Sequence, residues 1–306
     1  MTPVKLKQKL AIRYVRAQLN ILSLVSMQKA AIKAFRLFCT PQQRASGKYP
    51  AIFEKGEKLS FRLEGHMVRG HRWAPGGEAG KGSGMAVGVG KRAATPGDGT
   101  GRKILIAHGF ESSSRTFDAY IGALLKQGYE VVAFDAPAHG RSGGRRILLT
   151  SYVTMLRSIM DNYGPFDAWL GHSLGGLALV LALEDMQIET GSRLVLIAPP
   201  VETMAAVEVF AGLLHLPMAV VSEMDNYVEE ISGHPFSWYS LRRAIGQVRA
   251  DILYVQDEED QITPVREALL VERDGHPNIR FLFTRGLGHR KIYKDPEMIG
   301  QIVAFL

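Results

Sequence analysis

The sequence predicts an α/β fold, with a mainly parallel central sheet and helices on both faces. From residue 103 onward, short apolar runs alternate with segments of helical periodicity. The apolar runs lack the alternation of a strand with one solvated face, so they are typical of strands buried on both sides. Polar residues and glycines cluster where several of these runs end. In such a sheet, sites lie at the carboxyl ends of the strands, and we expect the functional residues there.

Residues 1–45 are predicted to form a basic amphipathic helical extension. Apolar side chains recur at steps of three or four, and Thr40-Pro41 ends the pattern. These side chains form two series, Val15, Leu19 and Leu22, then Leu24, Met27, Ala31, Phe35 and Phe38, which predict one or two amphipathic helices. Three interpretations are open: helices packed on the rest of the protein, a peripheral membrane contact through residues 1–40, or a signal peptide. Polar residues at positions 20, 23 and 26 interrupt the apolar centre that a signal peptide needs, which disfavours the third.

The charge distribution separates this extension from the rest of the chain. Residues 1–50 contain ten Lys or Arg residues and no Asp or Glu, whereas the remainder has 27 basic and 30 acidic residues. A nucleic-acid-binding body would need a basic footprint of its own, so we expect no nucleic-acid partner. No uncharged apolar run reaches the length of a membrane-spanning helix. The single cysteine, Cys39, excludes an internal disulfide framework, and we expect a cytoplasmic location, with peripheral membrane association open to the basic segment.

Residues 46–306 are predicted to form the α/β domain. Its first part, residues 52–73, alternates apolar and charged side chains around a turn, which predicts an antiparallel hairpin at a sheet edge. Residues 74–102 are glycine-rich and predict a loop. The Gly90-Lys91 pair in this loop is not a phosphate loop, because Met85 and Arg92 replace the glycine and hydroxyl residue required.

Alternating strands and helices then follow. The expected strands are 103–107, 130–134, 166–170, 193–198, 252–256 and 279–284, and the expected helices are 117–127, 151–163, 177–183, 264–272 and 296–306. Residues 201–250 are too long for a plain connection and predict a helical cap insertion over the site. Its apolar side chains either pack the cap or line an acyl pocket, which methionines can do with little strain.

The segment Gly171-His172-Ser173-Leu174-Gly175-Gly176 follows one expected strand and precedes a helix. That context indicates a nucleophile elbow, in which a serine occupies a sharp strand-to-helix turn. Gly171 and Gly175 would leave room for the neighbouring chain at this turn. The alternative is an ordinary Gly/Ser loop that caps a helix.

Three other strand ends carry groups that could act with this serine. They are His108-Gly109-Phe110, the acidic run from Asp257 to Asp260, and Gly286-Leu287-Gly288-His289. A serine hydroxyl needs a base, and the base needs a carboxylate to orient it and stabilise its cation. The order Ser, Asp, His along the chain is the order expected for a hydrolase of this topology.

Five segments together resemble the α/β-hydrolase superfamily, in particular the bacterial esterase-like and serine-aminopeptidase-like hydrolases. They are Ala107-His108-Gly109-Phe110, the run Asp135 to Ser142, Gly171 to Gly176, the run Asp257 to Pro264, and Gly286 to His289. The resemblance implies an α/β-hydrolase fold. It also implies that Ser173 is the nucleophile, His289 the general base and then acid, and Asp260 the orienting carboxylate. The backbone amides of Phe110 and Leu174 would form the oxyanion hole.

Other polar residues in these segments have competing interpretations. Asp257 is the alternative acid, but in the resembling pattern the second Asp, four residues before the proline, reaches the histidine. His108, His139 and His172 are expected to bond backbone groups at turns, and Asp135 to hold a loop. No cluster has metal-ligand spacing, so we expect no cofactor.

The sequence therefore predicts a cofactor-independent serine hydrolase that cleaves small-molecule carboxylic esters with a small or medium apolar acyl group. Peptidase, thioesterase and lactonase activities are open on the same triad, since fold and triad define only the reaction class. A non-catalytic membrane-surface binding protein of the same fold is the alternative from a different class.

Overall fold

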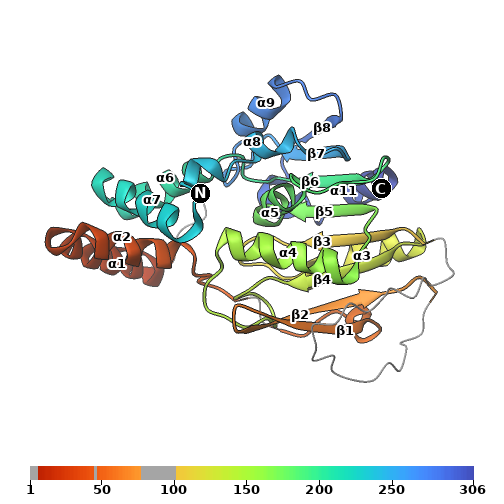
Figure 1. Cartoon of the computed structure of the whole chain (residues 1–306), viewed down its shortest axis with the longest axis horizontal. Helices are drawn as coiled ribbons and strands as arrows, with labels where there is room; N and C mark the ends of the chain where they lie inside the picture. Colours follow the sequence, from red (N-terminus) through yellow and green to blue (C-terminus); the bar gives the residue numbers. More distant parts are fainter. Residues whose placement is uncertain (1–5, 45–46, 77–100) are drawn as a thin grey trace. The chain divides into compact units, whose positions relative to one another are not determined.

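An eight-stranded sheet forms the centre of the larger of two compact units of the chain (Figure 1). The computed structural model describes residues 6–44, 47–76 and 101–306. The larger unit comprises Pro41–Val201 and Ala244–Leu306, and the smaller comprises Met1–Thr40 and Glu202–Arg243. Most of the glycine-rich segment predicted at 74–102 lies outside the described residues.

The sheet has the strand order β1-β2-β4-β3-β5-β6-β7-β8. The strands are β1 (Glu57–Leu63), β2 (His66–Trp73), β3 (Lys103–Ala107), β4 (Glu130–Asp135), β5 (Ala168–His172), β6 (Arg193–Ile197), β7 (Asp251–Asp257) and β8 (Ile279–Thr284). Strands β3 to β8 are parallel, whereas β1 pairs antiparallel with β2, and β2 with β4. The predicted hairpin is confirmed over residues 57–73, with β1 at the sheet edge and Glu64 and Gly65 at positive φ in its turn. The prediction was wrong at its start, because Ala51–Glu54 form a 3-10 helix.

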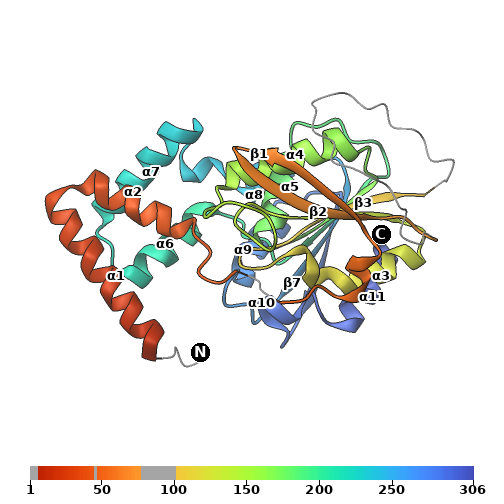
Figure 2. The same ribbon diagram turned by 90° about the horizontal axis from the view of Figure 1, so that it is seen from below.

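Helices cover both faces of the sheet, as the continuous apolar strands require. They are α3 (Asp118–Lys126), α4 (Leu149–Tyr163), α5 (Leu174–Leu183), α9 (Val265–Arg273) and α11 (Pro296–Phe305), with the shorter α10 (Gly288–Lys291). Helix α8 (Leu241–Ile245) spans the chain boundary between the two units. Figure 2 shows α4 and α5 over one face and α3 and α11 over the other. Under α3 and α11, Ile104, Val131, Tyr120 and Ile302 belong to one buried core. The predicted α/β architecture is confirmed.

The elbow strand begins and ends two residues later than the sequence predicted. Phe166 is buried and apolar, so its residue type resembles that of a strand residue. It follows Pro165, which has no N–H group to donate to a neighbouring strand. Pairing with β3 starts only at Ala168 and continues to Gly171, while the β6 ladder extends to His172. Helix α5 therefore starts at Leu174, directly after the serine, rather than at residue 177.

The smaller unit combines the N-terminal helices with helices from the segment between β6 and β7. It contains α1 (Leu6–Val25), α2 (Met27–Phe38), α6 (Thr203–Leu214) and α7 (Met218–Ser232). Helix α2 packs on α7, and the ring of Phe35 contacts those of Tyr227 and Phe236 at centroid distances of 5.6 and 6.1 Å. The predicted extension and the predicted cap insertion thus contribute helices to one compact unit, while residues 41–44 and 244–250 belong to the larger unit.

The apolar periodicity of residues 4–40 is divided between two helices at Ser26. The Ser26 hydroxyl oxygen caps α2 by accepting a hydrogen bond from the Lys29 amide at 3.3 Å. Leu19, Ala31 and Phe35 are buried, but Leu24 is 87% exposed. The prediction of one or two helices agrees with this division, but the second apolar series is wrong at Leu24, which precedes the cap and belongs to α1. No helix in the described part of the chain is both long enough and apolar enough to cross a bilayer.

Replacing Phe35 with alanine should destabilise the smaller unit by about 3–5 kcal/mol, the usual cost of removing a buried Phe side chain. Leu24→Ala is the matched control on the neighbouring helix, since its side chain is already in solvent. Urea unfolding followed by circular dichroism measures both. Equal effects of the two substitutions would contradict the packing of α2 on α7.

Candidate active site

Ser173 lies at a strained turn between β5 and α5. Its backbone has φ 52° and ψ −128°, a conformation that residues other than glycine rarely adopt. A Cβ at Gly171 would lie 2.6 Å from the Cα of Gly176, and one at Gly175 would lie 2.5 Å from the carbonyl oxygen of Ala107. No side chain fits at either position, which is the steric reason for the glycines predicted there.

The side chains of Ser173, His289 and Asp260, predicted from the sequence as a triad, lie together in the structure. The Ser173 hydroxyl donates to His289 Nε2, with Oγ and Nε2 3.0 Å apart. On the other side of the ring, His289 Nδ1–H donates to Asp260 Oδ2 at 2.7 Å. This pairing selects the tautomer in which Nε2 is free to accept the serine proton. Each side chain follows a different strand, β5, β7 or β8, and His289 lies in the short helix α10.

Asp260 is fully enclosed and held by its own loop. Its Oδ1 accepts the backbone N–H groups of Ile262 and Thr263 at 2.8 and 3.1 Å, and its Oδ2 accepts the Thr263 hydroxyl at 2.8 Å. Burial by itself raises the pKa of Asp260, but the hydrogen bond and charge of His289 and the two amides outweigh it and bring the pKa below its ordinary value. The carboxylate therefore stays ionised beside the imidazole.

Thr263 is a site residue to which the sequence analysis assigned no role. Besides bonding Asp260, its hydroxyl oxygen lies 3.1 Å from His289 Nδ1. A hydroxyl three residues after an aspartate is the available sequence signal, because such side chains often bond each other at a turn.

Asp257, the alternative acid, holds the backbone of the histidine loop instead of the imidazole. Its Oδ2 accepts the Thr284 hydroxyl at 2.8 Å and the Leu287 amide at 3.0 Å, while Oδ1 accepts the Glu259 amide at 3.0 Å. Burial opposes ionisation, but the Thr284 hydroxyl and the backbone donors lower the pKa of Asp257 overall. The geometry therefore pairs Asp260, and not Asp257, with His289.

His172 supports the same loop from the strand side. Its Nε2–H donates to the carbonyl oxygen of His289 at 3.0 Å, and its ring centroid lies 4.1 Å from that of Tyr293. Burial, followed by the effect of His289, lowers the pKa of His172 to about 3. The side chain is neutral and acts as a backbone support, as the sequence indicated.

The turn that carries Phe110 runs directly against Ser173. A Cβ at Gly109 would lie 2.9 Å from the Cβ of Ser173. His108 holds this turn, because its Nδ1–H donates to the Gly109 carbonyl at 2.8 Å and its Nε2 accepts the Ala136 amide at 2.9 Å. The Leu174 amide begins α5, where N–H groups have no acceptor within the helix. Both predicted oxyanion donors thus belong to segments that adjoin Ser173.

A second carboxylate, Asp135, holds the loop after β4. It accepts the Ser114 amide and hydroxyl at 2.9 and 2.8 Å and the Arg141 amide at 2.8 Å, and the Tyr49 hydroxyl also donates to it. In the same loop, His139 Nε2 accepts the Glu111 amide at 2.9 Å. Asp135 has the loop-holding role expected from the sequence, whereas Tyr49 has no local sequence signal.

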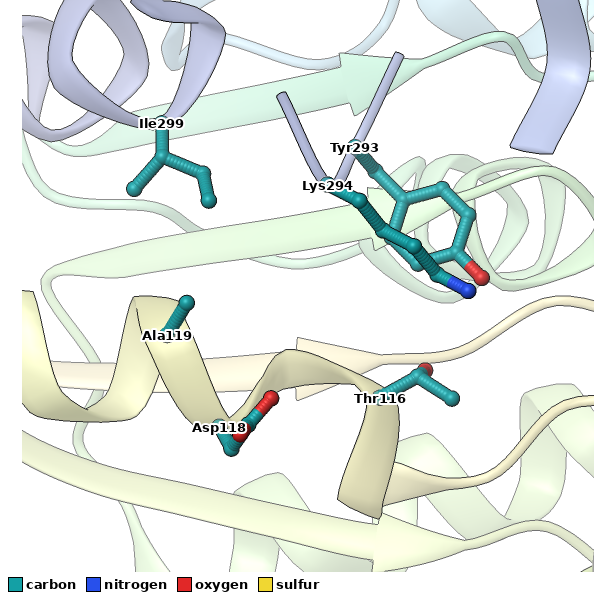
Figure 3. A pocket seen from close by; sticks show the side chains of 6 residues that line it. All are labelled: Thr116, Asp118, Ala119, Tyr293, Lys294 and Ile299. Carbon is teal, nitrogen blue, oxygen red and sulfur yellow. The ribbon is translucent and has the colours of Figure 1, made fainter. Parts of the chain in front are cut away.

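The surroundings of the triad within the larger unit are partly apolar. Phe110, in the turn that adjoins Ser173, is 38% exposed, and Ile262, in the Asp260 loop, is 60% exposed. A separate hollow of about 320 Å³ lies elsewhere, lined by Thr116, Asp118, Ala119, Tyr293, Lys294 and Ile299 (Figure 3). None of the triad residues lines it. Within residues 6–44, 47–76 and 101–306, no group of three His, Cys, Asp or Glu side chains is arranged to bind a metal.

The buried histidines predict a pH dependence of stability. Burial lowers the folded-state pKa of His108, and lowers the pKa values of His139 and His172 to about 3. The unfolded chain, with a histidine pKa of about 6.5, then binds more protons below that pH. The contribution of these histidines to the free energy of unfolding is fully present above about pH 6.5. It falls as the pH drops toward 3, by about 1.4 kcal/mol per pH unit for each histidine.

Urea unfolding at intervals from pH 8 to pH 5 measures this slope. His139→Gln should lower the slope of unfolding free energy against pH by about 1.4 kcal/mol per pH unit, because one buried imidazole is removed. Unfolding of the same variant at pH 8 gives the pH-independent cost of the substitution. A slope unchanged by the substitution would contradict the burial of a neutral His139.

Comparisons with known proteins identify relatives of the sequence and of the fold. The chain is 29% identical over 150 residues to a non-heme haloperoxidase of Rhodococcus erythropolis, over 45% of this chain and 54% of the relative, so it matches about half of that relative's length. An esterase structure from Pyrococcus furiosus aligns with a TM-score of 0.59 at 20% identity over 87% of this chain and 98% of the other. Mouse α/β hydrolase domain-containing protein 10 aligns with a TM-score of 0.53 at 18% identity, over 81% and 95%.

At such identities the structural likeness shows the fold. The serine aminopeptidase S33 family profile matches residues 100–282, which hold the strands β3 to β7, Ser173 and Asp260. The resemblance inferred from the five sequence segments is confirmed, and the chain belongs to the serine aminopeptidase S33 family of α/β-hydrolases.

Proposed function

We propose that the protein is a serine hydrolase that cleaves carboxylic esters with a small or medium apolar acyl group through a covalent acyl-enzyme. One observation carries the proposal: Ser173 Oγ, His289 and Asp260 form a continuous hydrogen-bonded series with distances of 3.0 and 2.7 Å. A serine, a base and an orienting carboxylate in this order are the minimum that activates a hydroxyl as a nucleophile.

In the proposed first half-reaction, Ser173 Oγ attacks the ester carbonyl carbon while its proton moves to His289 Nε2. The imidazolium is stabilised by ionised Asp260, and the carbonyl oxygen becomes an oxyanion. Collapse of this intermediate breaks the bond to the leaving alcohol, which takes the proton from Nε2. The products of this step are a free alcohol and an acyl group on Ser173.

In the second half-reaction, water attacks the acyl carbon and gives its proton to His289. The second tetrahedral intermediate releases the carboxylic acid, and Ser173 Oγ recovers its proton from Nε2. The amides of Phe110 and Leu174 are the proposed oxyanion donors in both halves, and one such donor typically contributes about 10²–10³ in rate. No other group is needed to balance either step.

Apolar side chains near the triad support an apolar acyl group. Phe110, in the turn that adjoins Ser173, and Ile262, in the Asp260 loop, both present exposed hydrophobic surface. The helical insertion follows the carboxyl end of β6 in the chain, and Ser173 follows the carboxyl end of the neighbouring strand β5. We include the insertion in the proposal as a determinant of substrate choice. The esterase of Pyrococcus furiosus shares the fold and is consistent with this activity.

Peptide cleavage is the second candidate, because the matching family is described as serine aminopeptidases. The same proton transfers apply to an amide, but the leaving amine must be protonated as it departs. Aminoacyl p-nitroanilides and a graded series of p-nitrophenyl esters separate the two activities directly. Thioester and lactone substrates belong in the same panel.

Ser173→Ala should abolish ester hydrolysis, with a loss of at least about 10⁴-fold in kcat, because the nucleophile is removed. Fluorophosphonate should label the wild-type protein at Ser173 and leave this variant unlabelled. Ser222→Ala, at an exposed serine of α7, is the matched control and should retain labelling and activity. Absence of labelling in folded wild-type protein would refute the hydrolase proposal.

The two candidate acids make a second prediction. Asp260→Asn should lower kcat by about 10⁴-fold, because an amide holds the wrong tautomer of the imidazole. Asp257→Asn should mainly lower stability, since its carboxylate bonds the Thr284 hydroxyl and two loop amides. Initial rates with the best p-nitrophenyl ester, measured on variants with native circular dichroism, decide the assignment. A larger loss of kcat in the Asp257 variant would transfer the role to Asp257.

A further inference from the structure

Helix α1 leaves a row of large apolar side chains in solvent. Tyr14 is 64% exposed, Ile21 65%, Leu24 87% and Val25 79%, and Leu10 is also more than half exposed. These residues form what we call the α1 stripe. Such a contiguous apolar surface is uncommon unless it has a partner.

The α1 stripe occupies one side of the helix. Leu10, Tyr14, Ile21 and Val25 are separated by four, seven and four residues, a spacing that places side chains on a common face. Helix α1 contacts α2 and α6 within the smaller unit, with Leu19 fully buried. The packing of that unit therefore uses a different face, and the stripe is not required to hold the four helices together.

Positive charge borders the stripe. Lys9 and Arg13 lie one turn apart on α1 and are exposed, at the edge of the apolar face. No Asp or Glu occurs anywhere in residues 1–50. A surface with apolar centre and basic border is complementary to an interface that offers both hydrocarbon and negative charge.

We propose that the α1 stripe docks onto the surface of a bilayer containing anionic lipids. The stripe enters the boundary between headgroups and acyl chains, where Tyr14 can keep its hydroxyl in the polar layer. Lys9 and Arg13 contact the anionic headgroups. The helix lies in the plane of the membrane and does not cross it. This docking does not depend on the proposed hydrolase chemistry.

A second copy of the chain fits this surface less well. Two α1 stripes packed together would also bring two basic borders into proximity. Helix α1 has no carboxylate with which to pair them. Like charges across an interface cost binding energy, whereas an anionic bilayer gains from the same residues.

Vesicle co-sedimentation of the full chain tests the proposal, with phosphatidylcholine vesicles compared with vesicles of about one-third phosphatidylglycerol. The wild-type protein should sediment with the anionic vesicles, and added salt should weaken this binding. Ile21→Gln/Val25→Gln should lower the partition coefficient about tenfold or more, because the apolar anchor is lost. Lys9→Gln/Arg13→Gln should lower it by a similar factor on anionic vesicles only.

Ile231→Gln/Leu270→Gln is the matched control, since it changes two exposed aliphatic residues on α7 and α9, and it should bind as wild type. Ser173→Ala should also bind as wild type, which separates this result from any failure of the proposed hydrolysis. Deleting residues 1–45 would be a poorer test, because it would also uncover the surface of α7 that Phe35 contacts.

Three outcomes would overturn the proposal. The first is wild-type protein that stays in the supernatant with anionic vesicles. The second is stripe variants that sediment as well as wild type. The third is a dimer that analytical ultracentrifugation detects in wild type and not in the Ile21→Gln/Val25→Gln variant, without vesicle binding, which would assign the stripe to another copy of the chain.

Discussion

The left-handed backbone of Ser173 is the constraint on which the site depends. A residue at φ 52° stores strain of about 1–3 kcal/mol, and it persists only where its neighbours hold it. Strand β5 pairs with β3 on one edge and β6 on the other, and α5 is buried from Gly175 to Leu183. Strand and helix are thereby anchored independently, and the turn between them has no freedom to relax. In this backbone conformation the serine hydroxyl lies within hydrogen-bond distance of His289.

The base is held by separate groups at its ring and at its backbone. Asp260 takes the imidazole N–H, Asp257 binds the loop amide of Leu287, and His172 donates to the carbonyl of His289 itself. These three come from the ends of two different strands, β7 and β5, so the histidine loop is supported from both. The buried imidazole of His172 suits this support, because burial keeps it neutral and its Nε2–H still donates to the loop backbone.

The smaller unit shows how one periodic pattern can contain two different kinds of face. Phe35 on α2 is covered by aromatic rings of α7 and its neighbourhood, whereas Leu24, eleven residues earlier, is in solvent. Both residues belong to the same apolar periodicity in sequence. Packing helices and surface-binding helices have the same amphipathic signature, since each needs only one apolar side.

The sequence alone determined the fold class and the three triad candidates. Buried parallel strands must be apolar throughout, a strained turn must have small neighbours, and a serine nucleophile needs a base and an acid. Each of these requirements restricts which residue types occur at a given spacing along the chain, so each can be recognised from the sequence. The helices of the hydrolase domain were predicted to within a few residues for the same reason.

Tertiary structure alone decided which groups meet across long separations. Thr263 near His289, Tyr49 on Asp135 and the His172 bond to the carbonyl of His289 join residues 26, 86 and 117 positions apart. The same holds for the union of α1 and α2 with α6 and α7 in one unit, and for the side of α1 left in solvent. Hydrogen-bond partners and covered faces depend on where the chain returns in space, and periodicity records only that a face exists.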